Sequence, residues 1–184
     1  MAVRRAVFLD RDGTLNREVG YLRTLAELEL LPGVSRALLR LGEAGFLRLV
    51  VTNQSGIARG YFDRAFVEET HEELRRRLRE EGADVEEFLV CPHHPDHTGP
   101  CGCRKPSPGL LQEAAARWDL DLAASWVVGD KPADIGLARA AGCRAALVRT
   151  GYGAESEAEL EGLGLVPDVV AADLEAAVRE IVTS

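Results

Sequence analysis

The sequence predicts an α/β domain with a mainly parallel, doubly wound sheet. Short apolar runs alternate along the chain with segments of helical apolar periodicity, which is the pattern of repeated βαβ units. Four of the apolar runs end at a chemically reactive side chain, namely Asp10, Thr52, Cys91 and Asp130. Because parallel strands present their carboxyl ends at one edge of a sheet, we expect these side chains to converge there. Residues 1–184 are expected to form a single domain with a metal-binding loop at 91–103.

The expected elements follow one another in regular order. Apolar runs too short for helices predict strands at 6–9, 47–51, 85–90, 125–130 and 144–148, with a short sixth strand at 168–170. Apolar residues at helical spacing predict helices at 34–41, 63–81, 110–118, 132–141 and 174–182. Pro32 precedes the first of these helices, and Gly45 and Gly142 follow the first and the fourth, as is typical of helix starts and stops.

Composition narrows the classes of partner. The net charge of −8 argues against general nucleic-acid binding, and no apolar run approaches the ~18 residues that a membrane span needs. A signal peptide is not expected, because Asp10 stands where its apolar core would continue. We therefore expect a cytoplasmic monomer that has no nucleic-acid or membrane partner.

The first apolar run leads directly into two carboxylates. Alternate residues of an extended chain share a face, so Asp10 and Asp12 can both point into one pocket beyond the strand. Gly13 permits a sharp turn, and Thr14 offers a hydroxyl beside the pair. Asp and Gly are also ordinary turn residues after a strand, so the pair alone does not establish a function.

The second apolar run ends in a polar loop that contains two glycines, residues 52–60. Its hydroxyls and exposed N–H groups suit an anion. Thr52 taken alone is also a common strand-end residue, so the loop as a whole carries the indication.

Cysteine and histidine are concentrated in one short segment. Three of the four cysteines and three of the four histidines fall within residues 91–103. The thiolates of Cys91, Cys101 and Cys103 with one imidazole would satisfy tetrahedral zinc, and four protein ligands leave no open position, so the predicted zinc is structural. Disulfides are the competing explanation, which a reducing compartment and the close spacing of Cys101 and Cys103 disfavour.

The chain contains only two lysines, Lys105 and Lys131, among 22 basic residues. With arginine as the general cation, a retained lysine marks a place where a compact ammonium group is needed. Arg104 and Lys105 directly follow the zinc loop, which would hold them at a fixed distance from a phosphate. Lys131 follows Asp130. Asp134 is expected next to the metal ligands but not among them, and a plain helix-start acid is the alternative.

Four separated motifs resemble those of the haloacid dehalogenase (HAD) superfamily of phosphatases: DRDGTLN at 10–16, TNQSGIARG at 52–60, RKP at 104–106 and GDKPAD at 129–134. The resemblance implies a HAD-like Rossmannoid fold, with Asp10 as nucleophile and Asp12 as general acid and base. It also implies that Thr52 and Lys105 hold the transferring phosphoryl group. Catalytic Mg²⁺ would be bound by Asp10, by the backbone carbonyl of Asp12 and by Asp130.

The zinc loop resembles that of the heptose-bisphosphate and histidinol-phosphate phosphatases. In that resemblance, Cys91-x-His93 makes His93 the fourth zinc ligand, with His97 in reserve and His94 outside the coordination sphere. The chain as a whole is most similar to the first family, whose members remove the C7 phosphate of D-glycero-D-manno-heptose 1,7-bisphosphate. Its compact length leaves no room for a large cap domain, so recognition of this small phosphorylated sugar would fall to loops. The expected substrate-binding residues are Glu18, Val19, Gly20, Tyr21, Thr52, Asn53, Gln54, Ser55, Arg104, Lys105 and Lys131.

Two other functions stay open. Histidinol-phosphate phosphatases share the motifs, and the zinc loop here has only seven residues between His93 and Cys101, which leaves substrate choice open. A non-catalytic, zinc-stapled module that binds phosphosugars is the alternative of another class. The Asp10 and Asp12 pair argues against it, because binding alone needs no nucleophile beside an acid.

Overall fold

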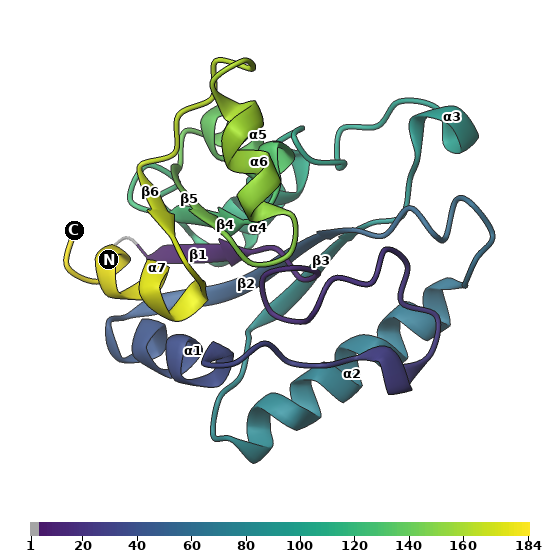
Figure 1. Cartoon of the computed structure of the whole chain (residues 1–184), viewed down its shortest axis with the longest axis horizontal. Coiled ribbons are helices and arrows are strands. Elements are labelled where there is room, and N and C mark those ends of the chain that lie inside the picture. The colour runs from purple at the N-terminus through teal and green to yellow at the C-terminus, as the bar shows by residue number, and fades with distance from the viewer. Residues whose placement is uncertain (1–3) are drawn as a thin grey trace.

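Six parallel strands form the centre of the protein in the order β3-β2-β1-β4-β5-β6, in a computed structural model that describes residues 4–184 (Figure 1). The strands are β1 (Arg5–Leu9), β2 (Phe46–Asn53), β3 (Glu87–Cys91), β4 (Trp126–Gly129), β5 (Arg144–Val148) and β6 (Val169–Ala171). The helices are α1 (Val34–Glu43), α2 (Arg64–Glu80), α3 (Pro95–Thr98), α4 (Gly109–Trp118), α5 (Pro132–Ala141), α6 (Gly153–Leu160) and α7 (Leu174–Ile181), with a 3-10 turn η1 (Leu25–Glu27). The doubly wound, parallel α/β fold predicted from the sequence is confirmed.

Helices cover both faces of the sheet (Figure 1). Val7 and Leu9 of β1 belong to a core that includes residues of α1, α2 and α7. Ala6 and Phe8 point the other way, into a core that includes residues of α4, α5 and α6. Residues 6–9 are fully buried because both faces are covered, which explains why β1 reads as an unbroken apolar run.

The order of the strands reverses next to β1. The chain moves outward from β1 to β2 and β3 on one side, and then returns to β4, β5 and β6 on the other. In open α/β sheets, the crevice at such a switch point, beyond the carboxyl ends of the strands, is where ligands bind. The carboxyl ends of β1 and β4 therefore mark the expected position of the site.

The predicted elements are found with small shifts in their bounds and three additions. β3 begins at Glu87, two residues after the predicted start, although Val85 is buried. The sequence did not predict α6, because GAESEAEL carries too few apolar side chains to form a clear stripe, and it did not predict the short elements η1 and α3. No large cap domain is present within residues 4–184, and none of their helices is long and apolar enough to span a membrane.

Candidate active site

The first carboxylate of the site stands directly beyond β1. Asp10 continues the ladder between β1 and β4, because its backbone N–H donates to the Val128 carbonyl at 2.9 Å. Its side chain is buried, and Oδ1 accepts hydrogen bonds from the backbone N–H of Arg11 at 2.8 Å and from Lys105 Nζ at 2.7 Å. The carboxylate is thus oriented before any ligand arrives, which favours a nucleophile.

Three buried carboxylates meet at this point. Asp10, Asp130 and Asp134 each offer an oxygen, and these oxygens lie within 4.8 Å of one another. Lys105 Nζ lies between two of them, at 2.7 Å from both Asp10 Oδ1 and Asp134 Oδ1, and donates a third bond to the Val51 carbonyl at 3.0 Å. Burial opposes the charge of Lys105, but the two carboxylates outweigh it and raise the pKa of its ammonium group.

Asp130 has one oxygen left to bind a cation. Its Oδ2 accepts the backbone N–H of Tyr152 at 2.8 Å, whereas its buried Oδ1 has no hydrogen-bond partner among residues 4–184. A Cβ added at Gly13 or at Gly151 would lie 2.2 Å from Oδ2, so the carboxylate fits closely between the two glycines. Burial and the charge of Asp10 raise the pKa of Asp130 to about 8. A hard divalent cation with oxygen ligands would relieve this repulsion, so the donor set fits Mg²⁺.

The side chain of Asp12 turns away from this group. Asn16 Nδ2 donates to its Oδ1 at 3.0 Å, Gln54 Nε2 donates to its Oδ2 at 3.0 Å, and Arg11 forms an ion pair with it. Burial alone would raise the pKa of Asp12, but the Arg11 charge and the hydrogen bonds from Asn16, Arg11 and Gln54 outweigh it, so the pKa lies below its usual value. Gln54 also donates to Thr52 Oγ1 at 2.8 Å, so its amide group links Thr52 of the second motif to Asp12 of the first.

Most of the predicted substrate residues line one cavity of about 260 Å³. The lining residues are Arg11, Asp12, Glu18, Gly20, Tyr21, Leu22, Asn53, Gln54, Ser55, Arg104, Lys105, Lys131 and Ala133. Val19 and Thr52 are not among them, since Val19 packs against the core and Thr52 is buried beneath Gln54. A larger hollow of about 680 Å³ lies along α2, but it contains none of the predicted site residues, and Arg76 in its lining is paired with Glu73 and Glu80.

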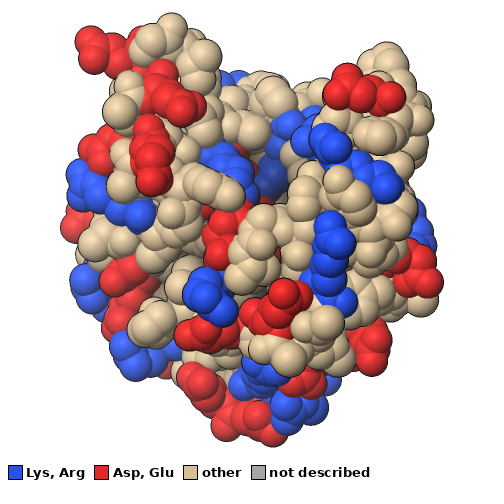
Figure 2. Space-filling model, turned by 45° about the vertical axis from the view of Figure 1, so that its right-hand side comes forward, with Lys and Arg blue, Asp and Glu red and all other residues tan. Residues whose placement is uncertain are grey.

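Cations stand around this cavity. Lys131 Nζ pairs with Glu18 Oε2 at 2.7 Å and lies 5.1 Å from the centroid of the Tyr152 ring. Arg104 donates from Nη1 to the carbonyl of His93 at 3.1 Å, which ties it to the cysteine-containing loop. Figure 2 shows one face of the molecule, with Lys and Arg side chains gathered around a hollow in its upper part, although the chain carries a net charge of −8. The local field there favours an anionic ligand.

Asn53 holds the backbone of Lys105 in place. Its Oδ1 accepts the Lys105 N–H at 3.1 Å, and its Nδ2 donates to the Lys105 carbonyl at 3.4 Å. Asn53 therefore links β2 to the segment that supplies the buried ammonium group, a structural contribution that its place in a polar loop did not reveal.

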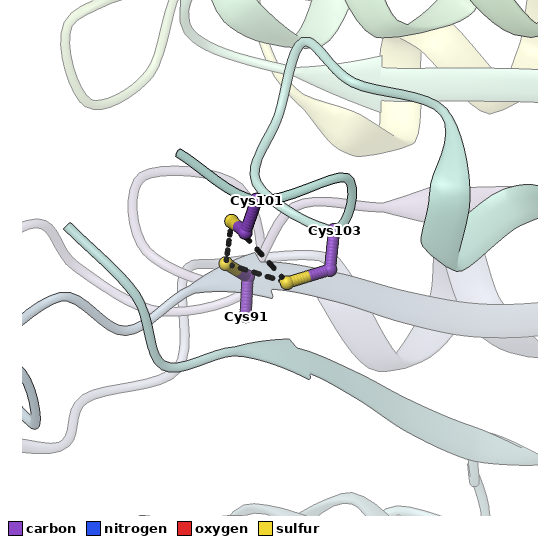
Figure 3. Close-up of side chains that lie close together, drawn as sticks. All are labelled: Cys91, Cys101 and Cys103. Atoms are coloured by element: carbon purple, nitrogen blue, oxygen red, sulfur yellow. Dashed lines mark hydrogen bonds between the residues drawn. The ribbon is translucent and has the colours of Figure 1, made fainter. Parts of the chain in front are cut away.

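The three clustered cysteines come together at the end of β3 (Figure 3). The sulfur of Cys91 lies 3.7 Å from that of Cys101 and 3.1 Å from that of Cys103, and the latter two are 3.6 Å apart. All are free thiols, and tetrahedral zinc with bonds of 2.3 Å would place its sulfurs about 3.7 Å apart. The cluster therefore fits three of the four coordination positions of tetrahedral zinc.

No histidine in the described part of the chain completes this group. His94 is engaged elsewhere, since its Nε2 lies 2.8 Å from Arg59 Nη2 and its Nδ1 accepts the Asp96 N–H at 3.2 Å. His97 packs edge-on against His94, with ring centroids 5.3 Å apart. The assignment of His93 as fourth ligand stays a prediction.

Reasoning from the sequence missed several contributors to the site. Asp134 was expected beside the metal ligands and not among them; it bonds Lys105, but that it also offers an oxygen to the group of three buried carboxylates was not foreseen. Asn16 carried a signal, because it closes the DRDGTLN motif. Gly151 and the backbone N–H of Tyr152 carried none, because both act through backbone geometry.

Comparison with known proteins agrees with this geometry. Residues 102–177 match a family model described as HAD-hydrolase-like. The chain is 45% identical to the D-glycero-D-manno-heptose-1,7-bisphosphate 7-phosphatase of Thermosynechococcus vestitus, over 98% of this chain and 96% of that protein. The chain belongs to this family of HAD phosphatases.

Other members of the family support the assignment. The D-glycero-beta-D-manno-heptose-1,7-bisphosphate 7-phosphatase of Pseudomonas aeruginosa is 44% identical, over 82% of this chain and 84% of that protein. The crystal structure of the D,D-heptose 1,7-bisphosphate phosphatase from B. bronchiseptica, complexed with magnesium and phosphate, superposes with a TM-score of 0.89 at 38% identity, covering 97% of this chain and 98% of that one. Membership in this family makes the protein a phosphoric monoester hydrolase.

Proposed function

We propose that this protein hydrolyses the C7 phosphate of D-glycero-D-manno-heptose 1,7-bisphosphate through an aspartyl-phosphate on Asp10, in a single domain of residues 1–184. The main support is the meeting of Asp10, Asp130 and Lys105 at the switch point of the sheet, next to a cavity rimmed by cations. The names of the relatives supply the substrate, and the site supplies the chemistry.

The first half of the reaction transfers the phosphoryl group to the protein. A carboxylate oxygen of Asp10 attacks phosphorus, the bond between phosphorus and the C7 oxygen breaks, and Asp12 gives its proton to the leaving alkoxide. Asp12 is ionised in the free protein; the charge of the incoming phosphate raises its pKa, so that Asp12 takes up a proton from solvent as the substrate binds and carries it to the leaving oxygen. Lys105 neutralises negative charge on the transferring group and keeps Asp10 in line.

The second half releases phosphate. Asp12, now ionised, takes a proton from water, and the hydroxide attacks the phosphorus of the aspartyl-phosphate. The bond between phosphorus and the Asp10 oxygen breaks, which restores the free carboxylate.

Three groups would hold Mg²⁺ at this site: the carboxylates of Asp10 and Asp130 and the backbone carbonyl of Asp12. When bound, the ion would neutralise charge that develops on the phosphoryl oxygens. Asp134 would remain bonded to Lys105. Gly13 and Gly151 would keep Asp130 oriented.

Substrate preference tests the proposed activity. With Mg²⁺ present, kcat/KM for heptose 1,7-bisphosphate is expected to exceed that for histidinol phosphate by at least about tenfold, because Arg104 and Lys131 can bind a second phosphate and would repel an amine. Both bisphosphate anomers are assayed, by phosphate release.

Arg104→Gln is expected to lower kcat/KM for the bisphosphate more than for a sugar monophosphate. A preference for histidinol phosphate would contradict the substrate assignment, and a complete lack of phosphate release would favour a binding module.

We also propose that the loop 91–103 holds one structural zinc ion. Protein purified without chelator is expected to contain zinc at about one ion per chain, and Cys101→Ser is expected to lose it and to lower Tm by about 5 °C. Cys143→Ser is the matched control, because Cys143 is a buried free cysteine outside the cluster. Metal analysis and thermal unfolding check both variants. Wild-type protein without zinc, or equal zinc content in both variants, would remove the assignment.

A further inference from the structure

His71 is a buried residue of α2 that the reaction described above does not use. Its side chain faces the sheet, where the ring stacks on that of Phe88 in β3 with a centroid separation of 4.2 Å and an interplanar angle of 9°. Its Nε2 lies 3.2 Å from Nη1 of Arg11, the residue between Asp10 and Asp12 in the first motif. The histidine thus connects α2 and β3 to the loop that carries Asp10 and Asp12.

The chemistry of the contact determines the role of each nitrogen. A guanidinium group has only donors, so His71 Nε2 must be the unprotonated nitrogen that accepts the hydrogen bond. Burial and the charge of Arg11 lower the pKa of His71 to about 3, so the ring stays neutral near neutral pH. The imidazole is therefore a constant acceptor that keeps the guanidinium edge in one place.

The opposite edge of the same guanidinium group holds Asp12. Arg11 donates to Asp12 Oδ1 from Nε at 3.3 Å and from Nη2 at 3.1 Å, and Nη2 lies 3.0 Å from Oδ2. Arg11 is itself buried, with 2% of its surface exposed. Because the group is planar and rigid, an acceptor on one edge sets the orientation of the other edge. A guanidinium released from His71 could rotate and carry the Asp12 carboxylate with it.

We propose that His71 is a positioning residue for proton transfer: through Arg11, it holds the carboxylate of Asp12 in line with the leaving group. This inference rests on the proposed function, in which Asp12 is the general acid. His71 is not among the residues that line the cavity, so its effect is expected in the chemical step and not in substrate binding.

Two substitutions separate the hydrogen bond from the ring packing. His71→Phe keeps a ring that can stack on Phe88 but removes the acceptor, whereas His71→Gln places an amide oxygen near the position of Nε2 but removes the ring. His71→Asn, whose amide stops short of Arg11, is a second variant without the acceptor in case the Phe variant does not fold. Circular dichroism and thermal unfolding verify the fold of each variant.

The readout compares two leaving groups. An alkoxide needs a proton from the general acid, whereas p-nitrophenolate leaves without one, and kcat/KM reports only the steps up to departure of the first product. For His71→Phe and His71→Asn, kcat/KM is expected to fall about tenfold with the sugar bisphosphate and less than about threefold with p-nitrophenyl phosphate. For His71→Gln, both values are expected to stay within about threefold of wild type.

The outcomes are distinguishable. If kcat/KM of His71→Phe falls equally for the two substrates, His71 acts through packing and the inference is overturned. The same holds if the fall specific to the sugar bisphosphate is larger in His71→Gln than in His71→Phe. In an Arg11→Leu background, His71→Phe is expected to have no further effect on the ratio of the two substrates, and an undiminished effect would likewise overturn it. Asp12→Asn tests the underlying function separately: if it retains the wild-type ratio, the general-acid role itself fails. If Asp12→Asn loses the sugar bisphosphate selectively and His71→Phe does not, only the positioning role fails.

Discussion

Replacing Asp10 with asparagine is expected to lower kcat by at least about 10⁴-fold while the fold is retained. An amide has nearly the same shape as a carboxylate and can still accept hydrogen bonds from the Arg11 N–H and from Lys105, but it cannot attack phosphorus to form an acyl phosphate. Phosphate release from heptose 1,7-bisphosphate in the presence of Mg²⁺ measures the loss, and thermal unfolding checks the fold.

Asp173→Asn is the matched control for this substitution. Asp173 caps the start of α7, where its Oδ1 accepts the Ala176 N–H at 2.8 Å, and asparagine caps helices equally well. Its activity is expected to equal that of wild type. Turnover by Asp10→Asn at the wild-type rate would remove Asp10 from the role of nucleophile, and with it the aspartyl-phosphate.

Lys105→Met is expected to reduce both stability and activity. The ammonium group is buried between Asp10 and Asp134, so its removal leaves two buried carboxylates without their shared cation. The free energy of unfolding is expected to fall by about 3 kcal/mol, the scale for removing one partner of a buried ion pair. In the proposed reaction Lys105 also neutralises the transferring phosphoryl group, so kcat/KM is expected to fall at least about 100-fold.

The only other lysine provides the comparison. Lys131 is partly exposed and pairs with Glu18 near the mouth of the cavity, so Lys131→Met is expected to change the free energy of unfolding by less than about 1 kcal/mol. Urea unfolding of both variants measures the difference. Equal losses of stability in the two Met variants would show that the buried network around Lys105 does not stabilise the fold.

What could be predicted from the sequence is clearest at the ends of the strands. Asp10 and Asp130 directly follow β1 and β4, and Thr52 is the second-last residue of β2, so the approximate place of the candidate site followed from the chain alone. α6 was missed because its residues have no clear apolar stripe, and β3 was begun too early because buried Val85 resembles a strand residue. Single-sequence periodicity reports which residues are buried and does not report which of them are hydrogen-bonded in a sheet.

Partner choice among the acids and bases could not be predicted in the same way. Asp134 was expected near the metal ligands, but its place in the sequence did not indicate that it shares Lys105 with Asp10 across more than a hundred residues of chain. His71 stands on the inner side of a helix whose exposed faces are rich in charge, and nothing near it in the sequence points to Arg11. Such pairs depend on which strands are neighbours.

By itself, the sequence determined the class of fold, the identities of the reactive groups and their position beyond the strands, because apolar periodicity and motif spacing are local properties of the chain. Only the tertiary structure decided that Asp10, Asp130 and Asp134 share one buried point, that Asp12 turns away onto Arg11, and that the sulfurs of three cysteines meet. The physical reason is that charge, hydrogen bonding and metal coordination act over a few ångströms in space, and the order β3-β2-β1-β4-β5-β6 sets which segments come that close.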